Sequence, residues 1–139
     1  MTVKIIEFTT LEKSGKPLLD SLAPKIGVVY VVAITRDGCP ACERQKPKLD
    51  KLATALAEKY ENPVVFTRIH VNYSPESQEE SLRSKDLLRH YFYPTNLILI
   101  RSRDKGAIEY YRNAAPSMSE LKSNIERAIE VAKFFEKPD

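Results

Sequence analysis

The feature that most constrains this chain is a continuous apolar run from Val28 to Ile34, which reads Val-Val-Tyr-Val-Val-Ala-Ile. A strand with one face in water alternates polar and apolar residues, whereas this run is apolar throughout and rich in β-branched side chains. It therefore predicts a strand that is covered on both faces, as in a sheet packed between helices. The run is far shorter than the roughly 20 residues that a membrane span needs.

The segments around this run predict alternating strands and helices. The expected elements are a strand over 3–8, a helix from 17, a strand over 28–34, a helix over 40–60, a strand over 64–71, a helix over 82–91, a strand over 97–100, a return strand over 107–111 and a final helix from 117. This order predicts an α/β fold with helices on both faces of a mixed sheet, parallel early and antiparallel at the hairpin. Thr9 with Glu12, and Ser117 with Glu120, predict capping boxes at helix starts.

The length, net charge and cysteine count of the chain exclude several classes of protein. The 139 residues contain no repeat or linker, so we expect a single domain over residues 1–139. A net charge of +3 is too small to indicate nucleic-acid binding or a polybasic membrane anchor. The N-terminal residues form no long apolar segment, so we expect a cytoplasmic protein without membrane partners. Two cysteines are too few for a secreted scaffold held by disulfides.

The two cysteines, Cys39 and Cys42, are separated by two residues and follow the buried strand where a helix begins. Reactive groups of open α/β sheets gather at this edge. Unpaired N–H groups at a helix start favour a thiolate, and lowering a thiol pKa of about 8.5 by about two units makes the thiolate the major form. Cys39, nearer the helix end, is expected to be the exposed nucleophile and Cys42 the shielded second thiol.

The spacing alone leaves a redox pair, half of a zinc site and a chance pair open. A zinc site needs two further ligands, and only His70 and His90 are available, 20 residues apart rather than three to five. We therefore disfavour zinc. His70 is expected to be an ordinary strand or surface residue, and His90 a residue at a helix end.

Two stretches resemble the thioredoxin superfamily. Residues 39–53 resemble its active-site helix, including Pro47, eight residues after the first cysteine. A proline inside a helix costs about 3 kcal/mol, so its presence there is informative. Tyr93-Pro94-Thr95 resembles the family's cis-proline loop. The resemblance covers approximately residues 3–135 and implies a thioredoxin-like fold, with Pro94 in the cis form.

The resemblance also implies a function, a thiol–disulfide oxidoreductase that acts on protein disulfides. In that case Cys39 attacks the substrate, forming a mixed disulfide, and Cys42 resolves it. Pro94, the Tyr93 backbone, Gly38 and Pro40 would bind the substrate. No cofactor and no nucleic-acid partner are implied. A protein like thioredoxin reductase, or another dithiol donor, would supply electrons.

The chain departs from the family at several positions. Gly38 replaces a tryptophan, Ala33 replaces a buried acid, and Ala114 replaces a glycine before the last helix. The missing acid implies slow turnover, because it is thought to help deprotonate the second cysteine. Two alternatives stay open: a glutaredoxin-like thiol transferase that uses glutathione, and a thioredoxin-fold module that binds a partner at Pro94 and uses the cysteines as a slow switch.

Overall fold

The computed structural model describes residues 3–15, 17–60 and 63–136. The elements, in chain order, are β1 (Lys4–Glu7), α1 (Phe8–Glu12), α2 (Leu18–Leu22), β2 (Val29–Arg36), α3 (Pro40–Lys59), β3 (Val64–Val71), α4 (Glu79–Leu88), β4 (Thr95–Arg101), β5 (Ala107–Asn113) and α5 (Met118–Glu136). No described helix is both long enough and apolar enough to cross a membrane.

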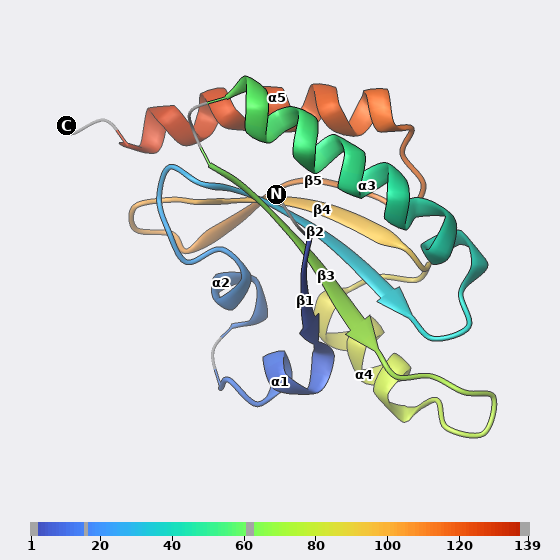
Figure 1. Cartoon of the computed structure of the whole chain (residues 1–139). Coiled ribbons are helices and arrows are strands. Elements are labelled where there is room, and N and C mark those ends of the chain that lie inside the picture. Colours follow the sequence, from blue (N-terminus) through green and yellow to red (C-terminus); the bar gives the residue numbers. More distant parts are fainter. Residues whose placement is uncertain (1–2, 16, 61–62, 137–139) are drawn as a thin grey trace.

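The strands form one mixed sheet in the order β1-β3-β2-β4-β5. β1, β3 and β2 are parallel, and β4 and β5 are antiparallel to their neighbours. Helices α3 and α5 lie side by side over one face, and α1, α2 and α4 lie on the other (Figure 1). The predicted mixed sheet between two layers of helices is therefore confirmed.

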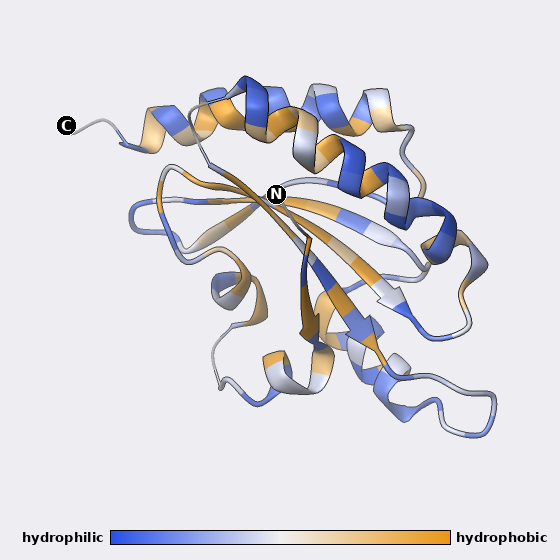
Figure 2. Ribbon diagram, viewed as in Figure 1, coloured by the Kyte–Doolittle hydropathy of each residue, from blue (hydrophilic) through white to orange (hydrophobic). Residues whose placement is uncertain are grey.

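Strand β2 is buried on both faces, as its apolar run predicts. Val29, Val31 and Ala33 pack with residues of α3 and α5. Their neighbours Tyr30 and Val32, with Ile34, pack in a second core on the side of α1, α2 and α4. The strands carry much of the orange of the ribbon, while blue and orange stretches alternate along α3 and α5 (Figure 2). The C-terminal end of β2 is thus rigidly placed.

Two details of the sequence-based interpretation change. Thr9 does not cap a helix, because the N-cap of α1 is Glu7, two residues earlier, and the helix begins at Phe8. The side chain of Glu7 makes no capping hydrogen bond. Glu12 instead forms an ion pair with Arg83 of α4 at 2.8 Å. At the start of α5 the expectation is confirmed for Ser117, whose Oγ accepts a hydrogen bond from the Glu120 N–H at 3.1 Å.

Helix α4 is also displaced from its predicted range of 82–91. It begins at Glu79 and ends at Leu88, where Arg89 takes a left-handed conformation with φ 57°. The helix therefore stops before the aromatic residues that precede Pro94, and these residues form a loop at the edge of the sheet.

Candidate active site

Cys39 and Cys42 lie where β2 passes into α3, joined by a disulfide with a Cα–Cα separation of 5.3 Å. Cys39 is the N-cap of α3, and its Sγ accepts a hydrogen bond from the Cys42 N–H at 3.2 Å. Pro40 is the first helical residue, a position that lacks an N–H partner in any helix. Cys39 is thus just outside the first turn, and its sulfur faces the unpaired N–H groups of the helix start.

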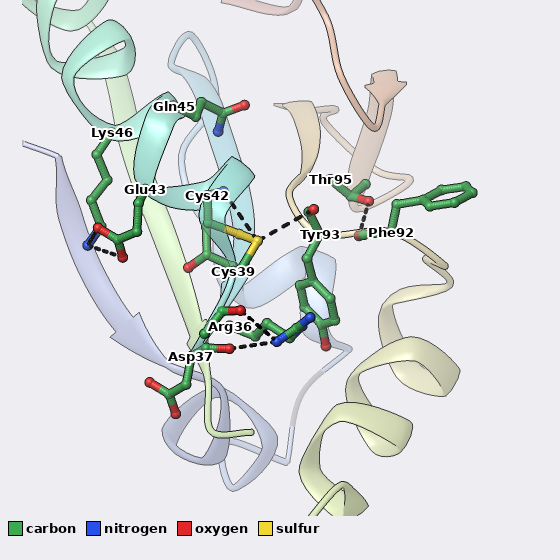
Figure 3. The surroundings of a disulfide bond; sticks show 12 residues. Arg36, Asp37, Cys39, Cys42, Glu43, Gln45, Lys46, Phe92, Tyr93 and Thr95 are labelled. Atoms are coloured by element: carbon green, nitrogen blue, oxygen red, sulfur yellow. Dashed lines mark hydrogen bonds and ion pairs between the residues drawn. A yellow bond between two sulfur atoms is a disulfide. The ribbon is translucent and has the colours of Figure 1, made fainter. Parts of the chain in front are cut away.

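The expected exposure of Cys39 is wrong for this oxidised form. Cys39 is 5% exposed and Cys42 is 2% exposed, so both are buried. The sulfur of Cys39 is covered from the side by the Tyr93 backbone, whose carbonyl oxygen lies 3.6 Å away (Figure 3). The Tyr93 backbone therefore borders the reactive sulfur directly.

The Tyr93–Pro94 peptide bond is cis, as the resemblance implies. Because β4 runs antiparallel to β2, Thr95 at the start of β4 pairs with Ile34 near the end of β2. This pairing places the loop opposite the cysteines. Thr95 Oγ1 donates a hydrogen bond to the Phe92 carbonyl at 2.7 Å, which fixes the backbone on both sides of Pro94.

Buried polar groups of α4 and of the segment after it contact the loop that contains Tyr93 and Pro94. The hydroxyl groups of Tyr93 and Ser81 are 3.0 Å apart, and His90 Nε2 lies 2.8 Å from Ser84 Oγ. His90 Nδ1 lies 3.3 Å from the Phe92 carbonyl, which can only accept, so Nδ1 carries the proton and Ser84 donates to Nε2. The rings of His90 and Tyr93 meet edge to face at 4.9 Å.

Burial, which outweighs the hydrogen bond to the Phe92 carbonyl, together with the charges of Lys85 and Arg112, lowers the pKa of His90 to about 4. His90 is therefore neutral at pH 7. It follows the end of α4, as predicted, but its role in holding the Pro94 loop was not predicted. In the sequence, only Ser81 and Ser84 hint at this role, and they can be interpreted as partners of the loop only when the position of α4 next to it is known.

Charged groups support the turn before Cys39 on the other side of the disulfide. His70 Nδ1 lies 2.9 Å from Glu7 Oε1, and His70 Nε2 lies 2.7 Å from Asp37 Oδ1. Asp37 Oδ2 also accepts a hydrogen bond from the Tyr73 N–H at 3.1 Å. Burial alone lowers the pKa of His70, but the hydrogen bonds to Asp37 and Glu7 outweigh it and raise the pKa above 6.5. The hydrogen bond from His70 lowers the pKa of Asp37.

Sequence reasoning treated His70 as an ordinary residue and missed this cluster. Glu7 and His70 are partners in the β1–β3 register, which depends on the strand order. The cluster borders an open pocket of about 360 Å³ that reaches Cys42 and is also lined by Glu43, Lys46 and Arg68. Among the described residues, no three His, Cys, Asp or Glu side chains are placed to hold a metal ion.

The turn itself is closed by Arg36 and Gly38. The Arg36 guanidinium donates to the Asp37 carbonyl at 2.7 Å and to the Gly38 carbonyl at 3.3 Å (Figure 3). It also lies over the ring of Tyr73, 4.1 Å from the centroid. Gly38 has φ +64°, a left-handed conformation that favours glycine. Glycine therefore suits this position for the shape of its backbone.

Two buried amide side chains, Gln45 and Asn96, lie near Ala33 in the core. Ala33, 1% exposed, is in register with Arg68 on β3 and with Asn96 on β4. Asn96 Nδ2 donates to Gln45 Oε1 at 3.0 Å. Gln45 Nε2 and Asn96 Oδ1 have no hydrogen-bond partner within the described ranges. The core beside the cysteines is thus polar but holds no carboxylate at this point.

A groove of about 160 Å³ lies beside Pro94, between α3 and the segment before α5. Its lining includes Ala41, Arg44, Lys48, Pro94, Ala114 and Met118. The structure thus brings Cys39, Tyr93, Pro94 and Ala114 together at one edge of the sheet. Gly38 and Pro40 flank Cys39 in the chain, and Pro40 lies between the two cysteines.

No protein-family model and no curated protein matches the chain. Solved structures do. The Trichomonas vaginalis thioredoxin is 16% identical with a TM-score of 0.62, covering 91% of this chain and 96% of that one. Chloroplastic thioredoxin z is 17% identical with a TM-score of 0.61, covering 94% and 96%. Thioredoxin f2 of Chlamydomonas reinhardtii is 16% identical with a TM-score of 0.60, covering 91% and 96%. The chain has the thioredoxin fold.

Proposed function

We propose that this thioredoxin-fold chain is a thiol–disulfide oxidoreductase that acts on protein disulfides, working as a single domain over residues 1–139. One observation carries the proposal: Cys39 and Cys42 form a disulfide at the start of α3, facing the cis peptide bond before Pro94. The fold it shares with solved thioredoxins supports the same reading.

In the reducing direction, the Cys39 thiolate attacks one sulfur of the substrate disulfide. A bond forms between Cys39 Sγ and that sulfur, and the other substrate sulfur leaves as a thiolate and takes up a proton. The Cys42 thiol then loses its proton to solvent and attacks Cys39 Sγ. The bound substrate sulfur leaves, and the Cys39–Cys42 disulfide remains. A dithiol donor, such as a protein like thioredoxin reductase, returns two electrons and two protons.

The geometry favours Cys39 as the attacking thiol. Its sulfur already accepts the Cys42 N–H, and the same contact stabilises negative charge on a thiolate. The partial positive charge of the α3 N-terminus acts in the same direction. Cys42 lies one turn inside the helix, where it reaches Cys39 more readily than it reaches a substrate.

The Tyr93 backbone is the proposed binding edge for the substrate chain. Its carbonyl lies 3.6 Å from Cys39 Sγ, so an extended peptide that pairs with this backbone brings its own sulfur to Cys39. Pro94 shapes the groove next to this edge. Gly38 and Pro40, the neighbours of Cys39 in the chain, are proposed to contact the substrate as well.

The test is turnover of insulin disulfides with dithiothreitol as the donor. Wild type is expected to turn over, Cys39→Ser to lose all turnover, and Cys42→Ser to accumulate a mixed disulfide visible by mass spectrometry. Equal rates for wild type and Cys39→Ser would overturn the proposal. Equilibration against glutathione then gives the direction, since about −270 mV marks a reductant and about −120 mV an oxidant.

A second candidate is a binding module with a slow redox switch. It is favoured by the burial of Cys39 and by Ala33 in the place of an acid, both of which slow exchange. In this case Cys39→Ser keeps its affinity for a partner, and wild type shows no turnover.

A further inference from the structure

The groove beside Pro94 continues along α3 into a second groove. This second groove, of about 350 Å³, lies between α3 and the start of α5, and Lys48 and Met118 line both. Helices α3 and α5 run next to each other on this face of the sheet (Figure 1). The two grooves therefore form one path, which starts beside the disulfide and follows α3. We call this path the α3–α5 groove.

Cations border the α3–α5 groove along its length. Arg44, Lys48 and Lys51 are spaced by four and three residues, so they share one face of α3, and Lys122 of α5 completes the lining. No Asp or Glu of the described chain lines either part. The floor between the cations is apolar, with Ala41, Leu52, Met118 and Pro94.

The nearby acids are occupied elsewhere. Glu43 pairs with Lys46 at 2.9 Å, and Glu126 pairs with Lys59 at 2.8 Å. Glu120 accepts hydrogen bonds from Tyr111 and Asn113. Within the ranges that the structure describes, the side chains of Arg44, Lys48 and Lys51 form no ion pair or hydrogen bond. Arg44, Lys48 and Lys51 are therefore available to an external anion, while Lys122 also interacts with the charge of Glu126.

We propose that the α3–α5 groove binds the polypeptide that carries the disulfide and selects segments with acidic side chains near the reactive cysteine. This inference rests on the proposed function, because the groove begins at the residues where exchange takes place. It adds a substrate class, acidic protein segments, to that function.

The lining favours a polypeptide over other polyanions. The apolar floor suits the aliphatic side chains of a peptide. Single-stranded nucleic acids bind on aromatic side chains that stack with bases. No Phe, Tyr or His of the described ranges lines either part of the groove.

The test uses two synthetic peptides, each with one internal disulfide, identical except for Glu or Gln at the positions flanking one cysteine. Exchange rates with each peptide and with a small aromatic disulfide are measured for wild type and for the double variant Arg44→Gln/Lys48→Gln. The matched control is Lys13→Gln/Lys25→Gln, which removes two exposed charges beside α1 and α2 on the opposite face.

We expect wild type to prefer the Glu peptide in kcat/KM by about threefold to tenfold, as two exposed ion pairs allow. The preference is expected to shrink in the groove variant and in high salt, and to persist in the control. The ratio of the two peptide rates is taken within each protein, so any change in the intrinsic rate of the cysteine pair, which the small disulfide reports, does not affect it.

Each other outcome is decisive. Normal exchange with the small disulfide but equal rates for both peptides overturns the groove inference alone. No exchange of wild type with any disulfide overturns the proposed function. If a mixed-sequence oligonucleotide blocks the Glu peptide at lower concentration than a disulfide-free Glu peptide does, the groove is a nucleic-acid site and the polypeptide inference is wrong.

Discussion

The two loops that flank the disulfide are held in opposite ways. The turn of residues 36–38 is supported by Glu7, His70 and Asp37, whose side chains are between 28% and 48% exposed and pair as charges. The loop at Tyr93 and Pro94 is supported by neutral groups, of which Ser84 is 0% and His90 is 3% exposed. One side of the site is charged and accessible to solvent, and the other is neutral and dry.

This difference implies that the Pro94 loop is rigid, whereas the turn of residues 36–38 responds to solution conditions. A buried and paired polar network is costly to break, because every lost partner leaves an unsatisfied group away from water. An exposed ion pair contributes little and responds to salt and pH. The loop that would bind substrate is therefore the fixed side of the site, and the turn that leads into Cys39 is the side that pH adjusts.

The largest expected effect comes from acidifying the buried side. With a pKa of about 4 in the folded state against 6.5, His90 holds fewer protons when folded, so stability falls as pH drops from about 6.5 to about 4. The loss from this group is about 2 to 3 kcal/mol. Urea unfolding at pH 7 and pH 4 is expected to show it in wild type and in the control His70→Gln, but not in His90→Gln. Equal losses in wild type and His90→Gln would contradict the comparison.

A smaller effect is expected at the turn before Cys39. Gly38→Ala places a Cβ on a left-handed residue and is expected to cost about 1 kcal/mol in the free energy of unfolding, measured in urea. It also shifts the carbonyls that Arg36 binds, so the exchange rate is expected to fall.

Gly15→Ala is the matched control for the turn. Gly15 has φ +71° and no atom within 4 Å of an added Cβ, so its cost in stability is expected to be similar while the exchange rate stays unchanged. An exchange rate that falls as much in Gly15→Ala as in Gly38→Ala would show that the turn has no special role.

The smallest effect is expected in the charged cluster. Asp37→Asn removes the negative charge beside His70 and leaves a single acceptor oxygen for both His70 and the Tyr73 N–H, so the pKa of His70 is expected to fall toward 6.5, as followed by NMR titration of its ring. A raised pKa in the folded state stabilises fully below 6.5, and this stabilisation is lost as pH rises through the folded pKa. The variant is expected to lose under about 1 kcal/mol at pH 6 and less at pH 8.

Glu7→Gln tests the other partner of His70 and is expected to shift the titration in the same direction. A ring titration of His70 that is the same in wild type and both variants would mean that the cluster does not control its charge.

The sequence predicts the strands and the long helices well, because each is defined by its own residues. The run at 28–34 and the apolar spacing of α3 need no knowledge of distant segments. A capping motif predicts a helix start wrongly where a tertiary contact favours a different start. Thr9 reads as a cap, but α1 begins at Phe8, which is fully buried in the second core, and Glu12 turns to Arg83. Packing thus shifts the start of a short helix.

In the candidate site, too, some residues can be predicted from the sequence and others cannot. Cys39, Cys42 and Pro94 are found from short motifs. The groups that hold them are not, because Glu7 and His70 meet only through the β1–β3 register, and Ser84 and His90 only when α4 folds back under the loop. Likewise, Lys122 joins the cations of α3 only through the packing of two helices that are far apart in the sequence.

The disulfide described above also bears on the entropy of the unfolded chain. Its cysteines are three positions apart, so it closes a very short loop. In a chain-entropy model such a loop contributes roughly 2 kcal/mol, against nearly 5 for a loop of 100 residues. Folding must therefore rest on the two apolar cores, and in the proposed exchange reaction the bond is able to open and close while the rest of the molecule stays assembled.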